Sequence, residues 1–128
     1  MSVGVIAHLD NPTIDEIERL AVTAEAAGGD WLGIADAFWW RDTWLLAAAA
    51  GRVTTRLAVG PVVTNPYLRH RFHTYSAIAT LQELVGPRVV LGLGAGGSEV
   101  SGAAHVPRDD AGRRIVELVE GVRAAAGG

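Results

Sequence analysis

Apolar residues gather along the chain in short continuous runs, which alternate with stretches in which apolar positions recur at helical spacing. The four runs predicted as strands are residues 3–8, 31–35, 57–63 and 88–94. They are apolar throughout instead of alternating with polar residues, as expected of parallel strands buried on both faces. The predicted order is βαβαβαβα, which is typical of a parallel α/β fold whose functional loops follow the carboxyl ends of the strands.

Each predicted helix follows a strand. In the first, Thr13 and Glu16 have the spacing of a capping box, and apolar residues recur every three or four positions from Ile14 to Ala27. The other helices are expected at residues 43–53, 72–85 and 109–126. No linker divides the pattern, so we expect a single domain over residues 1–128.

Composition excludes several functional classes. Apolar residues make up 49% of the chain and charged residues 20%, which indicates a folded globular protein. The net charge is −3 and the basic residues, all arginine, are scattered, so we expect no nucleic-acid partner. The chain has no cysteine, which excludes disulfides and thiolate metal sites and fits a reducing compartment. We see neither a signal peptide nor an apolar run long enough to span a membrane, so we expect a cytoplasmic protein without a membrane partner.

A glycine-rich loop follows the fourth predicted strand. Gly92, Gly94 and Gly97 have the G-x-G-x-x-G spacing of a dinucleotide-binding loop. In that fold, however, the motif follows the first strand and leads directly into a helix whose N-terminus meets the pyrophosphate. Here at least ten residues separate the glycines from the next helix. We therefore interpret them as a place where a ligand ring lies close to backbone at a strand end.

Residues 57–97, LAVGPVVTNPYLRHRFHTYSAIATLQELVGPRVVLGLGAGG, resemble the luciferase-like monooxygenase superfamily. The most similar branch uses the deazaflavin coenzyme F420 and includes methylenetetrahydromethanopterin reductases. AEAAGGDWLGIADAF, residues 24–38, resembles the second βα unit of that family, and the resemblance extends from Val3 to the fourth helix. It implies a (β/α)₈ barrel that binds its cofactor, F420 or alternatively FMN, at the carboxyl ends of the strands.

The resemblance also implies a set of site residues. Asp36 matches an Asp that lines the pocket, and Val62-Val63 matches a pair that often forms a non-prolyl cis peptide supporting the ring. The implied cofactor-binding residues are Val62, Val63, Thr64, Asn65, Gly94, Ala95, Gly96 and Gly97. The candidate catalytic residues are Asp36, His8 and Glu99.

Several of these positions have an alternative, purely structural interpretation. His8 ends the first strand and is a candidate acid or base, because histidine titrates near neutral pH. Asp36 could orient a substrate or cap the following loop. Trp39 and Trp40 are expected to wall a substrate pocket for a flat ligand, although they could also pack a helix or meet a partner, while Trp44 is expected in the core.

Two neighbouring polar groups are expected to be structural. Arg69 and His70 suit a loop anchor better than a catalyst. His70 and His73 could share a helix face, but we expect no metal site, because no third ligand is suitably placed.

The sequence departs from the family pattern at four positions. The usual His after the strand-two Asp is Ala37, the usual acid after the strand-four glycines is Gly97, the first residue of the cis pair is Val62, and the usual Pro is Arg71. Of these, Ala37 and Gly97 favour a non-catalytic partner as the alternative to an enzyme. The intact TNPYLRH and GLGAGG motifs favour the enzyme.

The four βα units make half of a barrel, which needs about 250 residues. Such a half has two open sheet edges and an uncovered core face. We expect a second chain carrying units five to eight to close it, because phosphate groups in such barrels bind after strands seven and eight. A homodimer, or a non-functional fragment, is the alternative. The expected function is that of a subunit of an F420- or flavin-dependent oxidoreductase, transferring hydride between the cofactor and a small organic substrate.

Overall fold

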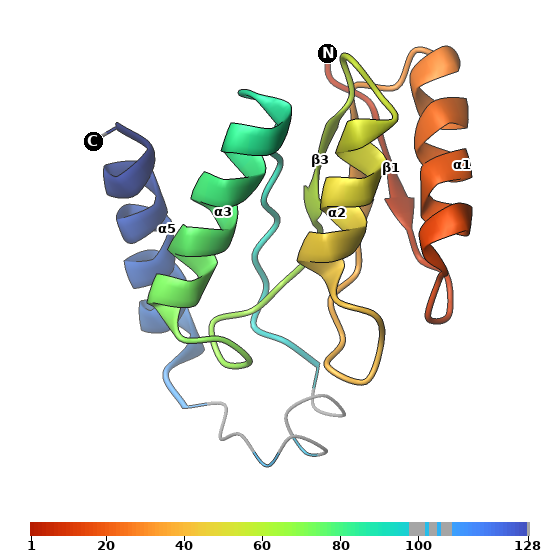
Figure 1. Ribbon diagram of the computed structural model, residues 1–128. Coiled ribbons are helices and arrows are strands. Elements are labelled where there is room, and N and C mark those ends of the chain that lie inside the picture. Colours follow the sequence, from red (N-terminus) through yellow and green to blue (C-terminus); the bar gives the residue numbers. More distant parts are fainter. Residues whose placement is uncertain (98–101, 103–104, 106–108, 128) are drawn as a thin grey trace.

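The computed structural model describes residues 1–97, 102, 105 and 109–127 and has the predicted α/β architecture (Figure 1). Three parallel strands form a sheet in the order β1-β2-β3. The elements, in chain order, are β1 (Gly4–Ala7), α1 (Ile14–Ala26), β2 (Trp31–Ile34), α2 (Thr43–Arg52), β3 (Ala58–Pro61), α3 (Arg71–Val85) and α5 (Ala111–Gly127). The strands point downward in Figure 1, so the loops that follow their carboxyl ends, which are expected to carry function, lie in its lower half.

The two faces of the sheet have different surroundings. Leu32, Ile34 and Val59 point to one face and are at most 1% exposed, because α1 and α2 cover it. Residues of the opposite face alternate with them, and Ile6 is paired there with Gly33. Ile6 is 51% exposed, since none of the described helices covers this face. The helices therefore lie on the outside of a curved sheet, as in one half of a (β/α)₈ barrel.

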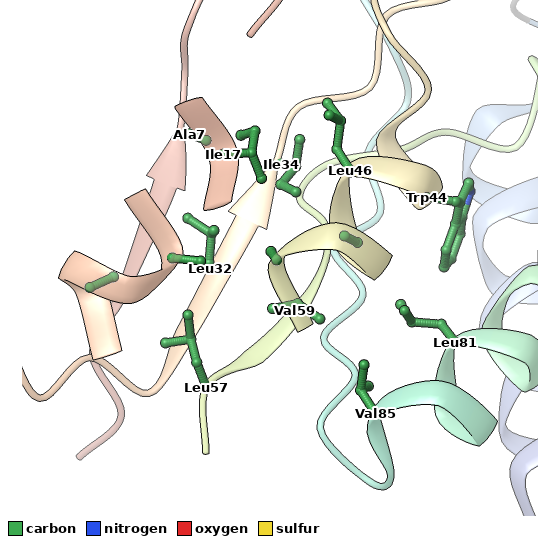
Figure 2. Close-up of a cluster of buried hydrophobic side chains, with 14 of the residues drawn as sticks. Ala7, Ile17, Leu32, Ile34, Trp44, Leu46, Leu57, Val59, Leu81 and Val85 are labelled. Atoms are coloured by element: carbon green, nitrogen blue, oxygen red, sulfur yellow. The ribbon is translucent and has the colours of Figure 1, made fainter. Parts of the chain in front are cut away.

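The hydrophobic core lies between the sheet and its helices (Figure 2). Small residues on α1 and α2 let these helices approach each other and the strands closely. Trp44 is 7% exposed and packs in this core, which confirms its expected place. The largest members are Ile17, Leu32, Ile34, Trp44, Leu46, Leu57, Val59, Ile78, Leu81 and Val85.

The prediction of a regular fourth strand at residues 88–94 was wrong in one respect. The segment lies parallel to β3 and is hydrogen-bonded to it, but it forms only isolated bridges. Gly92 N donates to Pro61 O and Thr64 N donates to Gly92 O, both at 2.9 Å. On the β3 side, the residues that bond to this segment are therefore Pro61 and then Thr64, three positions on, where a regular parallel ladder would advance by two. An extra residue at Val62-Val63 makes a bulge that interrupts the ladder and ends β3 at Pro61.

Local capping explains where the helices begin. The predicted capping box at α1 is present: Glu16 N donates to Thr13 Oγ1 and Thr13 N donates to Glu16 Oε2. Asp42 caps α2 by accepting from the backbone of Trp44 and Leu45. His70 caps α3, which begins one residue earlier than expected. No helix within the described residues has both the length and the apolar character that a membrane span requires.

Candidate functional site

The bulge after β3 presents two valines to the carboxyl-end edge of the sheet. The peptide bond between Val62 and Val63 is cis, as in the pair implied by the resemblance. Val63 is 49% exposed. Gly92 faces the bulge, and a Cβ there would lie 3.0 Å from Val62 Cγ1. Gly94 lies beside Val63 in the same way, so these two glycines leave room for the valine side chains.

A hollow of about 630 Å³ opens beside this bulge, and seven of the predicted site residues line it. It is within the size range of small-molecule sites, about 300–1,000 Å³. Its walls are mostly apolar, with His8 and Asp36 as the titratable groups. The lining residues are Ile6, His8, Ala35, Asp36, Ala37, Trp39, Trp40, Val62, Val63 and Gly97.

The other predicted site residues lie behind or beyond this hollow. Thr64 and Asn65 are 2% and 6% exposed and lie behind the bulge. Gly96 lies against the Asn65 side chain and has a φ of 79°, a backbone conformation that favours glycine. Gly94 and Ala95 are half-buried residues of the segment that leads to it. Glu99 lies outside the described residues.

Asp36 is held by two neighbours. Its side chain is only 4% exposed, and Thr64 Oγ1 donates to its Oδ2 at 2.7 Å. Arg69 Nη2 lies 3.8 Å from Asp36 Oδ1 and 2.8 Å from Asp42 Oδ2. One guanidinium therefore lies between the end of β2 and the cap of α2, and the Asp36 carboxylate contacts both a hydroxyl donor and a cation.

Asp42 has opposing influences on its carboxyl group. Burial alone would raise the pKa of Asp42. The hydrogen bond from Arg69 and those from the backbone N–H groups of Leu45 and Trp44 outweigh it, so the pKa is lowered overall. The charged form of the carboxylate is thus the one that the Arg69 contact and the helix cap stabilise.

The TNPYLRH segment turns back toward the sheet because of Asn65. Its Oδ1 accepts from Tyr67 N at 2.9 Å and from Leu68 N at 3.1 Å, which is the side-chain turn that Asn commonly forms. This turn returns Arg69 to Asp36 and places His70 at the start of α3, where its Nδ1 accepts from the backbone of that helix. The expected loop-anchoring role of Arg69 and His70 is confirmed by these contacts.

The loop between β2 and α2 carries exposed aromatic side chains. Phe38 and Trp39 are 49% and 47% exposed and meet edge to face, with ring centroids 4.9 Å apart and an interplanar angle of 78°. Arg41 fixes the loop: its N–H donates to Asn11 Oδ1 and its Nη1 to Asn11 O, both at 2.8 Å. Sequence reasoning missed Phe38 and Arg41. The run of three aromatics directly before a helix cap was the available signal.

No group of three or more His, Cys, Asp or Glu side chains that could hold a metal ion occurs among the described residues.

Comparison with known sequences finds the luciferase-like monooxygenase family model over residues 1–128. The 5,10-methylenetetrahydromethanopterin reductase of Archaeoglobus fulgidus is 33% identical over 108 residues, which cover 84% of this chain and 32% of that protein. The enzyme of the same name from Methanopyrus kandleri is 36% identical over 87 residues, covering 68% of this chain and 24% of that protein. The chain thus spans a third or less of the length of these relatives.

Solved structures share the fold. The coenzyme F420 dependent tetrahydromethanopterin reductase from Methanopyrus kandleri has a TM-score of 0.78 and 30% identity, and the match covers 83% of this chain and 30% of that one. An F420-dependent secondary alcohol dehydrogenase has a TM-score of 0.78 at 22% identity, and the match covers 96% of this chain and 42% of that one. With a family model matched over its whole length and the fold shared with the N-terminal portion of such enzymes, the chain belongs to the luciferase-like monooxygenase family.

Proposed function

We propose that the chain is the first half of an oxidoreductase barrel that binds F420, or alternatively FMN, and transfers hydride between the cofactor and a small organic substrate. The observation that carries the proposal is the hollow at the carboxyl ends of the strands, which the bulge at Val62-Val63 lines with apolar side chains. The similarity to an F420 dependent reductase, and the fold shared with an F420-dependent alcohol dehydrogenase, support F420 as the first choice. A second family structure, a Baeyer-Villiger monooxygenase in complex with FMN, keeps FMN as the alternative.

The residues of the hollow suit a flat ring. Val62 and Val63 make an apolar wall at the bulge, and Trp39 and Trp40 line the same hollow. Apolar and aromatic walls of this kind suit a planar ligand, whose faces are apolar. When bound, the cofactor supplies the hydride chemistry. The valines support one face of its ring, and the tryptophans wall the substrate space and keep water out.

His8 is the candidate proton carrier of this half. It is exposed and lines the hollow, so it can reach a substrate group there. An imidazole can accept a proton at one ring nitrogen and donate one from the other, which suits a general acid or base. Asp36 lines the same hollow, but its carboxylate is occupied by Thr64 and Arg69. We therefore give Asp36 the task of orienting groups and His8 that of holding or moving a proton.

A non-catalytic subunit is the second candidate. Ala37 is 7% exposed and stands directly after Asp36, where it can neither donate nor accept a proton. If the lost side chain were needed for the reaction, this half-barrel would serve only to complete a complex.

The proposal includes a second half-barrel that supplies units five to eight. β1 pairs only with β2 within the described residues, and Ile6 on the inner face is half exposed. Unpaired edges and uncovered apolar faces associate readily. A different chain suits this role better than a second copy, because a copy would repeat the first-half loops and would lack the loops that usually bind phosphate.

Native mass spectrometry of the protein purified without denaturation from its own host tests the proposal. A particle holding the 13.4 kDa chain, a second half-barrel and a bound deazaflavin or flavin would support it. A homodimer with cofactor would replace the second chain by a second copy. A particle without cofactor would favour the non-catalytic subunit.

A substitution in the bulge tests the ring-binding wall directly. Val63→Asp places a charge on the apolar wall, and we expect it to weaken binding of F420 and FMN by about a hundredfold. Val53→Asp is the matched control, because Val53 is 41% exposed, lies at the C-terminal end of α2 and is not among the residues that line the hollow. Equal binding by the two variants would contradict the assignment of this wall.

A further inference from the structure

Four side chains, of which Asp36 lines the hollow, form a continuous series of contacts that we name the Arg69 relay: Asp42, Arg69, Asp36 and Thr64. Asp42 accepts from Arg69 at 2.8 Å, Arg69 lies 3.8 Å from Asp36, and Thr64 donates to Asp36 at 2.7 Å. The relay connects the start of α2, the loop before α3, the end of β2 and the bulge after β3. The relay connects these elements through side-chain atoms, in addition to the backbone bond from Val62 N to Ile34 O, and its Asp36 and Thr64 members are almost fully buried.

Thr64 is where the relay meets the bulge. It directly follows the cis peptide pair, so its position sets where Val62 and Val63 lie. Its N–H donates to Gly92 O and its carbonyl accepts from Gly94 N, both at 2.9 Å. Its hydroxyl, bonded to Asp36, provides the connection in the other direction, toward β2. Val62 N also donates to Ile34 O at 2.8 Å, so the Thr64 hydroxyl supplies the side-chain part of the bulge's attachment to β2, and its loss would weaken that attachment.

Arg69 keeps Asp36 in place. The Asp36 side chain is 4% exposed, and a buried carboxylate needs a cation or several donors nearby. Arg69 is the cation in contact with it among the described residues, and Asp42 holds Arg69 in turn. Asp42 is itself fixed, because it caps α2. Without Arg69, the two carboxylates would lose the charge between them, and Asp36 would gain by turning toward water in the hollow.

We propose that Arg69 is a positioning residue, which fixes the bulge at Val62-Val63 through Asp36 and Thr64 without touching the ligand itself. The effect on cofactor binding rests on the function proposed above. The effect on the bulge does not rest on that function, because it concerns contacts within the chain. An experiment can therefore contradict the positioning role of Arg69 and the proposed function separately.

Hydrogen exchange on the intact protein in its native assembly tests the effect on the bulge. In Arg69→Gln we expect the amides of Thr64 and Gly94 to exchange about tenfold faster, because Asp36 is no longer held in place and the side-chain attachment of the bulge to β2 is weakened. Arg56→Gln is the matched control: Arg56 also connects elements, donating to Gly29 O and Glu25 O at the opposite end of the sheet. Exchange at Thr64 and Gly94 that is unchanged in Arg69→Gln, or equally fast in Arg56→Gln, would overturn the proposal.

A pair of substitutions at Thr64 separates positioning from general stability. Thr64→Val removes the hydroxyl with little change in shape, and Thr64→Ser keeps it. We expect Thr64→Val to reproduce the faster exchange and to weaken FMN and F420 binding about tenfold, and Thr64→Ser to restore both. Thr80→Val, which removes an exposed hydroxyl bonded to Ser76 O, should change neither.

The outcomes distinguish the two proposals. Faster exchange in Thr64→Val, in an assembly that binds neither cofactor even as wild type, would leave the relay standing and contradict the proposed function. Cofactor binding in the wild type with unchanged exchange in Thr64→Val would support the function and overturn the relay. If Arg69→Gln fails to fold, the Thr64 pair decides alone.

Discussion

The two ends of the sheet use polar side chains for different purposes. At the amino-end rim, where the strands begin, Arg88 and Glu25 bind backbone groups of several elements. At the carboxyl-end rim, where the strands end, Trp39, Val63 and His8 are exposed around a hollow. In barrels of this kind, the first rim contributes stability and the second carries the site. The same sheet therefore has a closed hydrogen-bond network at its amino-end rim and an open, largely apolar hollow at its carboxyl-end rim.

The polar residues of the carboxyl-end rim are not all open to ligands. The Arg69 relay adjoins the hollow and resembles the amino-end rim in its closed bonding. The exposed lining of the hollow is mostly apolar and aromatic, and the Arg69 relay that adjoins it is polar. A functional surface that is rigid because of the layer behind it requires less ordering when a ligand binds.

The largest effect that separates the rims is expected at Arg88. Its guanidinium donates to Val85 O, Leu57 O, Thr54 Oγ1 and Gly51 O, and so joins α2, α3 and the start of β3. Arg88→Met should lower the free energy of unfolding by about 3 kcal/mol, because partly buried carbonyls lose a charged donor. Urea denaturation measures this loss. Arg52→Met, at an exposed position at the end of α2, should be close to neutral. Equal losses of unfolding free energy in the two variants would contradict the role of Arg88 in joining these elements.

At the carboxyl-end rim, Trp39→Ala should have the opposite profile. Trp39 is 47% exposed, so stability should hardly change. Binding of FMN or F420 by the assembled barrel should weaken about tenfold, because an aromatic wall of the hollow is lost. Fluorescence titration of each cofactor measures the affinity. Leu45→Ala is the control, since Leu45 is 71% exposed on α2 and away from the lining of the hollow. A loss of stability without a loss of affinity would place Trp39 with the structural residues.

How much could be predicted from the sequence differs between local and long-range features. The strands β1, β2 and β3 were found from their apolar runs, and the capping box of Thr13 and Glu16 from four adjacent residues, because local preferences determine both. The prediction of a regular strand at residues 88–94 was wrong, because the bulge opposite it depends on how this segment pairs with β3. The periodicity of apolar residues carries no information on the pairing between two segments.

In the candidate site, too, the sequence predicted which residues take part but not which of them contact one another. Resemblance pointed to Val62, Val63 and Asp36, and the structure brings them to one hollow. That Asp36 would bind Thr64 and Arg69 could not be predicted, since Asp36 lies on the loop after β2, the other two lie on the loop after β3, and each has several possible partners. Residue types indicate what chemistry is possible, and only the packed structure decides which partners meet.

The smallest expected effect concerns pH and returns to the amino-end rim. The Glu25 carboxylate accepts hydrogen bonds from the backbone N–H groups of Arg56, Leu57 and Thr55, and these lower its pKa from the ordinary value of 4.5. A lowered pKa in the folded state means that the stabilisation is complete above about pH 4.5 and is lost as the pH falls through the lowered pKa. Because the carboxylate is open to water, we expect it to contribute only about 1 kcal/mol.

Measuring the free energy of unfolding of wild type and of Glu25→Gln from about pH 2 to about pH 7, a range that includes the pKa in both states, tests this expectation. The free energies of unfolding should differ most near neutral pH, where the wild-type carboxylate is charged, and should converge in acid, where it is protonated. Glu18→Gln, on the same helix, is the control and should follow the wild type throughout. A difference that stays constant with pH would mean that Glu25 stabilises the rim by its shape and not by its charge. A similar pH dependence for Trp39→Ala would remove the distinction between the two rims, because the open rim would then also depend on a charged network.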